Sequence, residues 1–191
     1  MSARLVYVVG PSGAGKDSLL AWLAQRLGPD SGVAFARRTI TRAVQADGEQ
    51  HESIDVAGFA RLQEAGDFGL AWEANGLRYG VRRAALPPHV EAAQVIVNGS
   101  RAYLAEASRR FPGMSVVHVT ASVATLRQRL LARGRESTEM VEARVRRALD
   151  AHLPAGPGVI EIRNDHTLAQ AGEALAQALG LAPGQRAAAL S

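Results

Sequence analysis

A glycine-rich stretch near the N-terminus, GPSGAGKDS (residues 10–18), has the residue types and spacing of a phosphate-binding loop. The pattern G-x-x-x-x-G-K-[ST] is met from Gly10 through Lys16 and fails at Asp17, where a hydroxyl that binds metal is expected. The glycines allow backbone N–H groups to turn inward around phosphate oxygens, and the lysine ammonium reaches the outer phosphates. The loop is therefore predicted to bind the phosphates of a nucleotide through Gly10, Pro11, Ser12, Gly13, Ala14, Gly15, Lys16, Asp17 and Ser18.

Lys16 and Asp17 are the two charged residues at the exit of this loop. Of the 22 basic residues, 21 are arginine and only Lys16 is lysine, which indicates that this position needs a compact ammonium, and we predict that it is catalytic. The carboxylate of Asp17 would repel phosphate unless a divalent cation lies between them. Asp17 is therefore a candidate ligand of the Mg²⁺ of Mg·ATP, with the hydroxyl of Ser18 nearby. The alternative, that Asp17 only stabilises the positive N-terminus of a helix, stays open.

The hydrophobic pattern predicts the elements that hold this loop in place. Residues 4–9 form an apolar, β-branched run typical of a strand, and residues 16–27 have the periodicity of a helix. Further strands are predicted at 94–98, 115–120 and 159–163, alternating with helices at 101–110, 123–133 and 168–179. Strands that alternate with helices in this way predict an α/β fold with a parallel sheet flanked by helices on both faces.

The chain of 191 residues is long enough for one good core, and we predict a single domain over residues 1–181. Residues 34–92 contain a polar, turn-rich stretch, a helix near 55–64 and short strands around 70–79, and they predict an inserted substrate-binding lobe. Residues 133–142 are charged, contain glycine and are flanked by helical patterns, so they predict a mobile lid. Residues 182–191 are expected to be a frayed tail.

Composition and charge argue against several classes of function. The absence of cysteine rules out disulfides and thiolate metal sites and fits a reducing compartment, so a cytoplasmic location is expected. The apolar run before Gly10 is too short for a signal sequence or a membrane span, and no membrane partner is expected. A net charge of +4 could serve nucleic-acid binding, but the arginines are dispersed without a run, so no nucleic-acid partner is predicted.

Several motifs together resemble the guanylate-kinase-like family of P-loop kinases, and the resemblance covers about residues 4–180. They are GPSGAGKDSLL at the loop, TITR (39–42) with Gly48-Glu49 after it, NGLRYGV (75–81), LRQRLLARGRE (126–136) with Arg144, and Asn164-Asp165. The resemblance implies a P-loop NTPase fold of the nucleoside-monophosphate-kinase type and transfer of the γ-phosphoryl group of ATP.

The resemblance also implies roles for residues far along the chain. Arg133 and Arg144 match the lid positions of the family, eleven residues apart, and are implied to be catalytic. Asn164 and Asp165 are implied to bind ATP by fixing the loop on the adenine side. A helix N-cap explains this pair equally well, because Asp165 precedes the last predicted helix.

Within that fold, the stretches GKDS, ANGLRYGV and VNGSRA (97–102) are similar to the ribose 1,5-bisphosphate phosphokinases. Three departures from guanylate kinases agree with this: Gln45 replaces an arginine, His51 replaces a tyrosine that binds phosphate, and Leu70 stands where a glutamate reads guanine. Guanine N–H groups buried without that acceptor would cost about 1–3 kcal/mol each. The implied partners are ATP and ribose 1,5-bisphosphate, and the implied products are 5-phosphoribosyl 1-diphosphate (PRPP) and ADP.

The residues expected to bind the acceptor are donors that can clamp a phosphate or a sugar hydroxyl. They are Arg38, Thr41, Arg42, His51, Tyr79, Arg82, Asn98, Ser100 and Arg101. The motif positions Arg42, Tyr79 and Arg101 are favoured. Exposed charges explain Arg38 and Arg82 equally well, and His51 is more simply an ordinary polar residue. Trp72 and Phe68 are interpreted as core aromatics.

Two other functions stay open at this point. Another small-molecule kinase of the same fold, guanylate kinase above all, would use the same loop. A non-catalytic guanylate-kinase-like binding module would share the fold, but such modules usually lose the phosphate loop, whereas this chain keeps Gly15-Lys16. The sequence does not decide between a monomer and a homodimer.

Overall fold

The computed structural model describes residues 3–43, 51–132, 134, 137–150 and 158–181. The chain divides into two compact units, of which the first comprises residues 1–7 and 29–115 and the second residues 8–28 and 116–191. Strand β1 (Arg4–Val9) contributes to both units, because the division falls between Tyr7 and Val8. The prediction of one domain with an inserted lobe is not decided by this division and stays a prediction.

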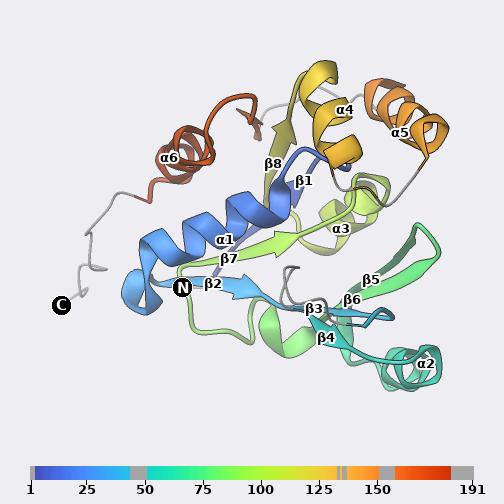
Figure 1. Ribbon diagram of the computed structural model, residues 1–191. Helices are drawn as coiled ribbons and strands as arrows, with labels where there is room; N and C mark the ends of the chain where they lie inside the picture. The colour runs from blue at the N-terminus through green and yellow to red at the C-terminus, as the bar shows by residue number, and fades with distance from the viewer. Residues whose placement is uncertain (1–2, 44–50, 133, 135–136, 151–157, 182–191) are drawn as a thin grey trace. The chain divides into compact units, whose positions relative to one another are not determined.

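The first unit holds strands in the order β2-β7-β1 (Figure 1). β2 (Val33–Ala36) and β7 (Gln94–Asn98) pair in parallel, with Phe35 opposite Ile96. The strands predicted at 4–9 and 94–98 are confirmed. A polar, turn-rich stretch is predicted at the position of β2, and this prediction is wrong, because the run VAFA is apolar enough to pair with the buried strand β7.

A second sheet of the first unit has the strand order β4-β3-β6-β5. Its strands are β3 (Arg38–Ile40), β4 (Glu52–Ser53), β5 (Phe68–Ala74) and β6 (Leu77–Arg82). Asn75 and Gly76 have positive φ angles and make the two-residue turn between antiparallel β5 and β6, as expected for an Asn-Gly pair. Helix α2 (Val56–Glu64) packs Phe59 on Phe68 with ring centroids 4.6 Å apart. The helix and strands predicted between 55 and 79 are confirmed.

Short helices complete the first unit. Two of them are 3-10 turns. η1 (Pro29–Ser31) follows the glycine that ends α1, and η2 (Arg83–Ala85) follows strand β6. The helix predicted at 101–110 begins as a third 3-10 turn, η3 (Arg101–Tyr103), and continues as α3 (Leu104–Arg110). The prediction is therefore right in position but not in type for the first turn.

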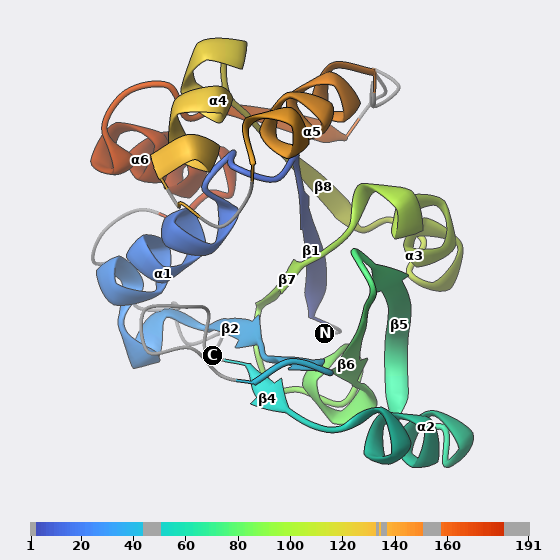
Figure 2. The same cartoon turned by 45° about the vertical axis from the view of Figure 1, so that its right-hand side comes forward.

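The second unit holds strands in the order β1-β8-β9, with β8 (Ser115–Thr120) and β9 (Val159–Arg163) paired in parallel. Its helices are α1 (Lys16–Leu27), α4 (Val123–Ala132), α5 (Thr138–Asp150) and α6 (Leu168–Ala178). Figures 1 and 2 both show α4 beside α5. Helix α1 packs closely on α6, because a Cβ added at Gly172 would lie 2.1 Å from Cε3 of Trp22. The strands and helices predicted in this unit are confirmed, with ends within one residue where the structure describes them.

The predicted lid and tail fall partly or wholly outside the described residues. Residues 133, 135 and 136 of the lid are outside, and residues 138–142 form the first turns of α5 instead of a loop. The tail at 182–191 also lies outside, as do Gln45 and Gly48-Glu49 of the motifs.

Candidate active site

The phosphate loop links β1 to α1 and is shaped by glycines that have no room for a side chain. Gly15 has φ +84° and is the N-cap of α1, so the loop enters the helix through a left-handed residue. A Cβ at Gly10 would lie 2.2 Å from the carbonyl oxygen of Val119, and a Cβ at Gly15 would lie 2.6 Å from Nδ2 of Asn164. The loop backbone at these two glycines therefore lies too close to Val119 and Asn164 for a side chain, as is typical of a glycine-rich loop that binds phosphate.

Lys16 lies across this loop: its Nζ donates to the carbonyl oxygen of Gly10 at 2.8 Å and to that of Pro11 at 3.3 Å. Asp17 and Ser18 are exposed in the first turn of α1. Among the described residues, no group of three or more His, Cys, Asp or Glu side chains could hold a metal ion. One carboxylate and one hydroxyl fit an Mg²⁺ that arrives on a nucleotide and keeps phosphate and water ligands.

Two arginines of the second unit contact the loop, and only one of them is predicted. Arg144 on α5 donates from Nη1 to Oγ of Ser12 at 3.2 Å, and Arg129 on α4 donates from Nη1 to the carbonyl oxygen of Ala14 at 3.5 Å. Arg129 is not among the predicted site residues, although the helical spacing of Arg129 and Arg133 in LRQRLLARGRE is a signal for it. Arg133 itself lies outside the described residues, so its role stays a prediction.

An ion pair holds α4 and α5 together. Arg127 donates to both carboxylate oxygens of Glu142, at 2.5 and 2.9 Å. Such a two-bond pair fixes the relative position of the two helices better than a single contact does. Arg127 therefore contributes to the packing of α5 on α4.

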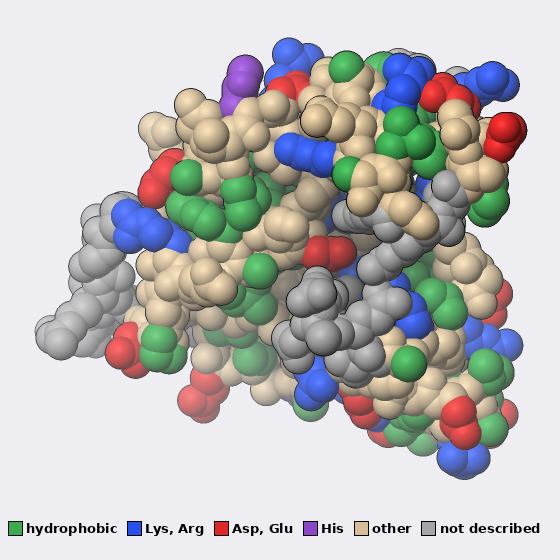
Figure 3. All heavy atoms as spheres, in the orientation of Figure 1, with side chains coloured by type: hydrophobic (Ala, Val, Ile, Leu, Met, Phe, Trp, Pro, Cys, Tyr) green, Lys and Arg blue, Asp and Glu red, His purple; other side chains and the backbone are tan. Residues whose placement is uncertain are grey.

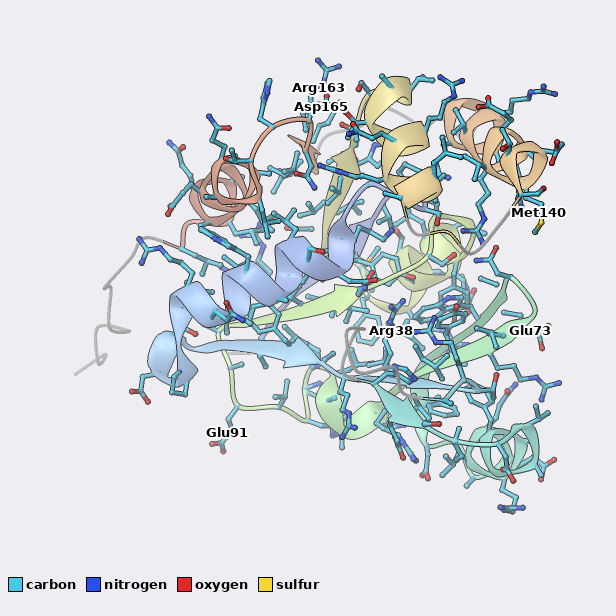
Figure 4. All side chains as sticks on the ribbon, viewed as in Figure 1. Arg38, Glu73, Glu91, Met140, Arg163 and Asp165 are labelled. Atoms are coloured by element: carbon cyan, nitrogen blue, oxygen red, sulfur yellow. The ribbon has the colours of Figure 1, made fainter. Side chains whose placement is uncertain are left out.

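Asn164 and Asp165 follow β9 and fix two neighbouring loops. Asn164 is 2% exposed, its Nδ2 donates to the carbonyl oxygen of Ala14 at 2.8 Å, and its Oδ1 is buried without a partner among the described residues. Oδ1 of Asp165 accepts from the backbone N–H of Ser122 at 2.6 Å, and this bond lowers the pKa of Asp165. Figure 4 shows Arg163 beside Asp165, and Nε of Arg163 lies 3.6 Å from Oδ2.

The alternative that this pair forms the N-cap of the last helix is wrong. The N-cap of α6 is Thr167, whose hydroxyl accepts from the backbone N–H of Gln170 in a capping box. A Thr three residues before a Gln is the stronger N-cap signal, so the sequence itself indicates Thr167 as the N-cap.

In the first unit, one face of the β4-β3-β6-β5 sheet gathers predicted acceptor residues. Tyr79 on β6 is paired with Trp72 on β5, and their rings are parallel within 3° with centroids 5.6 Å apart. Cζ of Arg38 on β3 lies 5.4 Å from the centroid of Tyr79 (Figure 4 labels Arg38). Because paired residues share a face of an antiparallel sheet, these three side chains lie on the same face, which we call the Tyr79 face.

Arg82 lies on the opposite face. It pairs with Phe68, and its Cζ lies 5.4 Å from the centroid of that ring. Its Nη2 contacts Oε1 of Glu52 at 2.6 Å, which lowers the pKa of Glu52, and its Nη1 lies 3.5 Å from Asp67. The structure therefore does not bring Arg82 together with Arg38 and Tyr79, and it engages Arg82 in an ion pair that helps hold β4 to the sheet. The sequence carried a signal for this, since Tyr79 and Arg82 are three residues apart on one strand and therefore point to opposite faces.

The segment after β3 is tied down by three hydrogen bonds. Oγ1 of Thr41 accepts from the backbone N–H of Arg78 at 2.9 Å. His51 is 1% exposed, with its Nε2 3.0 Å from the carbonyl oxygen of Arg42 and its own carbonyl oxygen accepting from Arg37. Among the described residues, Nε of Arg42 is buried without a partner. Thr41 and His51 thus support the backbone at Arg42, and the unpaired donor of Arg42 is suited to an anion.

Tyr7, which is not among the predicted site residues, supports the segment 98–101. The Tyr7 hydroxyl accepts from the backbone N–H of Ser100 at 3.0 Å, and a Cβ at Gly99 would lie 2.1 Å from Cζ of its ring. Burial raises the pKa of Tyr7 to about 12, so it stays neutral. In the same segment, Asn98 is buried, and burial lowers the pKa of Arg101. The ring of Tyr7 therefore fits only a glycine at 99 and fixes the residues on either side.

The phosphate loop between a strand and a helix, with arginines of α4 and α5 upon it, defines a P-loop kinase fold. A solved structure agrees: guanylate kinase from Anaplasma phagocytophilum superposes with a TM-score of 0.67 at 16% identity, over 96% of this chain and 87% of that chain. No protein-family model matches the chain.

Curated relatives narrow the class. A ribose 1,5-bisphosphate phosphokinase PhnN from Thiobacillus denitrificans is 44% identical over 176 residues, which are 92% of each chain. One from Burkholderia pseudomallei is 44% identical over 185 residues, 95% of this chain and 99% of that protein. The chain belongs to the ribose 1,5-bisphosphate phosphokinase PhnN family.

Two further features concern membrane-spanning helices and surface charge. Within the residues that the structure describes, no helix has the length and apolar character needed to cross a membrane. Figure 3 shows Lys and Arg side chains at several separate places on the visible face, as the dispersed arginines of the sequence predict.

Proposed function

We propose that this chain is a kinase that transfers the γ-phosphoryl group of ATP to the 1-phosphate of ribose 1,5-bisphosphate, giving PRPP and ADP. The observation that carries the proposal is the 44% identity to a ribose 1,5-bisphosphate phosphokinase over 92% of each chain, in a protein that keeps the phosphate-loop pattern from Gly10 through Lys16. The match runs along nearly the whole of both chains.

The second unit supplies the residues for ATP. The backbone of residues 10–15 would bind the phosphates, and Lys16 would exchange its contacts with loop carbonyls for phosphate oxygens. Asp17 and Ser18 would hold the Mg²⁺ that comes with the nucleotide, and that ion supplies positive charge to the phosphates. Arg144, already on Ser12, would stabilise the charge of the transferring group, and Arg133 is assigned the same role from its family position.

The first unit supplies the residues for the acceptor. Arg38 and Tyr79 on the Tyr79 face, the buried donor of Arg42 and the segment 98–101 offer positive and polar groups for two phosphates and sugar hydroxyls. Arg82 is left out of this set, because Glu52 engages it on the other face of the sheet.

The chemistry needs no general base in the protein. A phosphate monoester has a second pKa of about 6, so the acceptor phosphate is largely a dianion at neutral pH and its oxygen is already a nucleophile. The bond between the γ-phosphorus and the bridging oxygen of ATP breaks as the new phosphorus–oxygen bond forms, and ADP leaves. The task of the protein is to overcome repulsion between two polyanions, which a lysine and several arginines can do.

A direct assay tests the proposal. Purified protein with Mg·ATP is given ribose 1,5-bisphosphate or GMP, and both ADP release and PRPP formation are measured. We expect PRPP with the sugar phosphate, little ADP with GMP, and no turnover by a Lys16→Ala control. Arg38→Ala and Arg82→Ala form a matched pair, in which only the first should raise KM for the acceptor. Efficient phosphorylation of GMP instead would replace this proposal with a guanylate kinase.

A further inference from the structure

The ring of Tyr79 is flanked by a neighbour from each adjacent strand. β6 lies between β3 and β5 in the sheet, so Arg38 and Trp72 approach Tyr79 from opposite sides. Cζ of Arg38 lies 5.4 Å from the ring centroid, and the indole of Trp72 stacks in parallel at 5.6 Å. Both distances are within the usual range for cation–π and aromatic contacts, so the ring has stacking partners already.

Trp72 is buried and has a second aromatic neighbour. The ring of Tyr103, at the end of η3, lies 5.7 Å from Trp72 with an angle of 28° between the planes. Trp72 is only 8% exposed, and Tyr79 only 9%. The side chains thus form a series of contacts in the order Arg38, Tyr79, Trp72 and Tyr103. In this series the indole of Trp72 lies between the rings of two tyrosines.

A nucleobase in this place would need two things that the Tyr79 face lacks. It would need an open aromatic surface for stacking and polar partners along its edge. The indole covers the surface of Tyr79, and Leu70, which lies on the same face, is a fully buried apolar residue. The nearest carboxylate on β5, that of Glu73, lies on the opposite face, where its Oε1 accepts from Arg78 at 3.1 Å. The Tyr79 hydroxyl and the Arg38 guanidinium are instead groups of the kind that bind phosphate.

We propose that Trp72 is a specificity-determining residue: its indole fills the ring-stacking position beside Tyr79 and so closes the acceptor site to nucleobases. The inference rests on the proposed function, in which Tyr79 contacts a sugar phosphate. Nucleotides are then rejected as acceptors for two reasons. The indole of Trp72 occupies the space that a base would need, and position 70 has no carboxylate to bind the base edge.

The test removes the indole and supplies it again from solution. Trp72→Val leaves a residue that suits a strand and opens the stacking position. Saturation-transfer NMR would measure the binding of free indole, and kinetics would measure KM for ribose 1,5-bisphosphate and inhibition by GMP. Trp22→Ala is the matched control, because Trp22 is the other tryptophan of the sequence and packs on Gly172 in the second unit.

The loss of aromatic stacking predicts a rise in KM for the acceptor of about ten-fold in Trp72→Val, with KM for ATP unchanged. Millimolar indole should bind to the variant and lower this KM again, and GMP should become an inhibitor that competes with the acceptor. Trp22→Ala should show none of these changes. A folded Trp72→Val protein that binds no indole and resists GMP would overturn the inference, and Trp72→Ala gives the same readout if the valine variant does not fold.

The design separates this inference from the proposed function. Indole binding is measured without turnover, so it reports on the stacking position even if wild-type protein makes no PRPP. Wild-type activity on ribose 1,5-bisphosphate together with an unresponsive Trp72→Val would refute only the role of Trp72.

Discussion

The contact between Gly15 and Asn164 gives a prediction whose magnitude follows from the structure. In Gly15→Ala, the new Cβ would sit at φ +84° and 2.6 Å from Nδ2 of Asn164. The left-handed conformation costs alanine about 1–2 kcal/mol. Displacing Asn164 also breaks its bond to Ala14, which leaves buried groups unpaired at a cost of about 1–3 kcal/mol. The sum is about 2–5 kcal/mol of lost stability.

Gly180→Ala is the matched control for this variant. Gly180 also has a positive φ, of +71°, and a Cβ there would meet no atom within 4 Å. Its backbone bonds after α6, from Gly180 to Gln177 and from Leu181 to Ala176, are those of a left-handed helix cap. This variant should lose only the conformational part, about 1–2 kcal/mol.

Thermal and urea unfolding followed by circular dichroism would measure the difference. We expect Gly15→Ala to melt about 2–12 °C below Gly180→Ala, because 1 kcal/mol corresponds to about 2–4 °C in a chain of this size. A double-mutant cycle with Asn164→Ala should show that the two changes cost less together than the sum of each alone. Equal Tm values for the two glycine variants, or strictly additive costs in the cycle, would refute the reasoning.

Three further predictions concern charged residues. Arg144→Ala should lower kcat about 100-fold with little change in the Kd for ATP, whereas Arg147→Ala on the exposed side of α5 should be near normal in the same steady-state assay. Asp17→Ser should shift the Mg²⁺ concentration needed for half-maximal turnover, and an unchanged titration would leave Asp17 as a helix-dipole residue only. Glu52 has its pKa lowered by its hydrogen bond from arginine, so its stabilising effect is present above its ordinary pKa of 4.5 and is lost as pH falls through the lower folded value. Glu52→Gln should therefore flatten the acid side of a plot of stability against pH.

The sequence predicted the parts of the fold that depend on local pattern. The apolar runs at β1, β8 and β9 and the periodicity of α1 set those elements to within a residue, because a buried strand and an amphipathic helix leave clear signals. Strand β2 was missed because four residues between turns carry too little periodicity.

Features that depend on tertiary contacts were harder to predict for the candidate site. Strand parity alone separates Arg82 from Tyr79, but the pairing of β3, β5 and β6 that puts Arg38 and Trp72 on the face of Tyr79 is announced by no single residue type. The contact of Tyr7 with Ser100 joins residues 93 apart in the sequence, and the contact of Arg129 with Ala14 joins residues 115 apart. The residue types in these contacts are common and lie in no recognisable motif, so their roles can be seen only in the folded chain.

The lone lysine has a practical consequence. Reagents that acylate or reductively methylate amines would find one side-chain target in this sequence, the Nζ of Lys16 against the carbonyl of Gly10. A spectroscopic tag placed there would report on the phosphate loop and on no other side chain, because arginines do not react with these reagents.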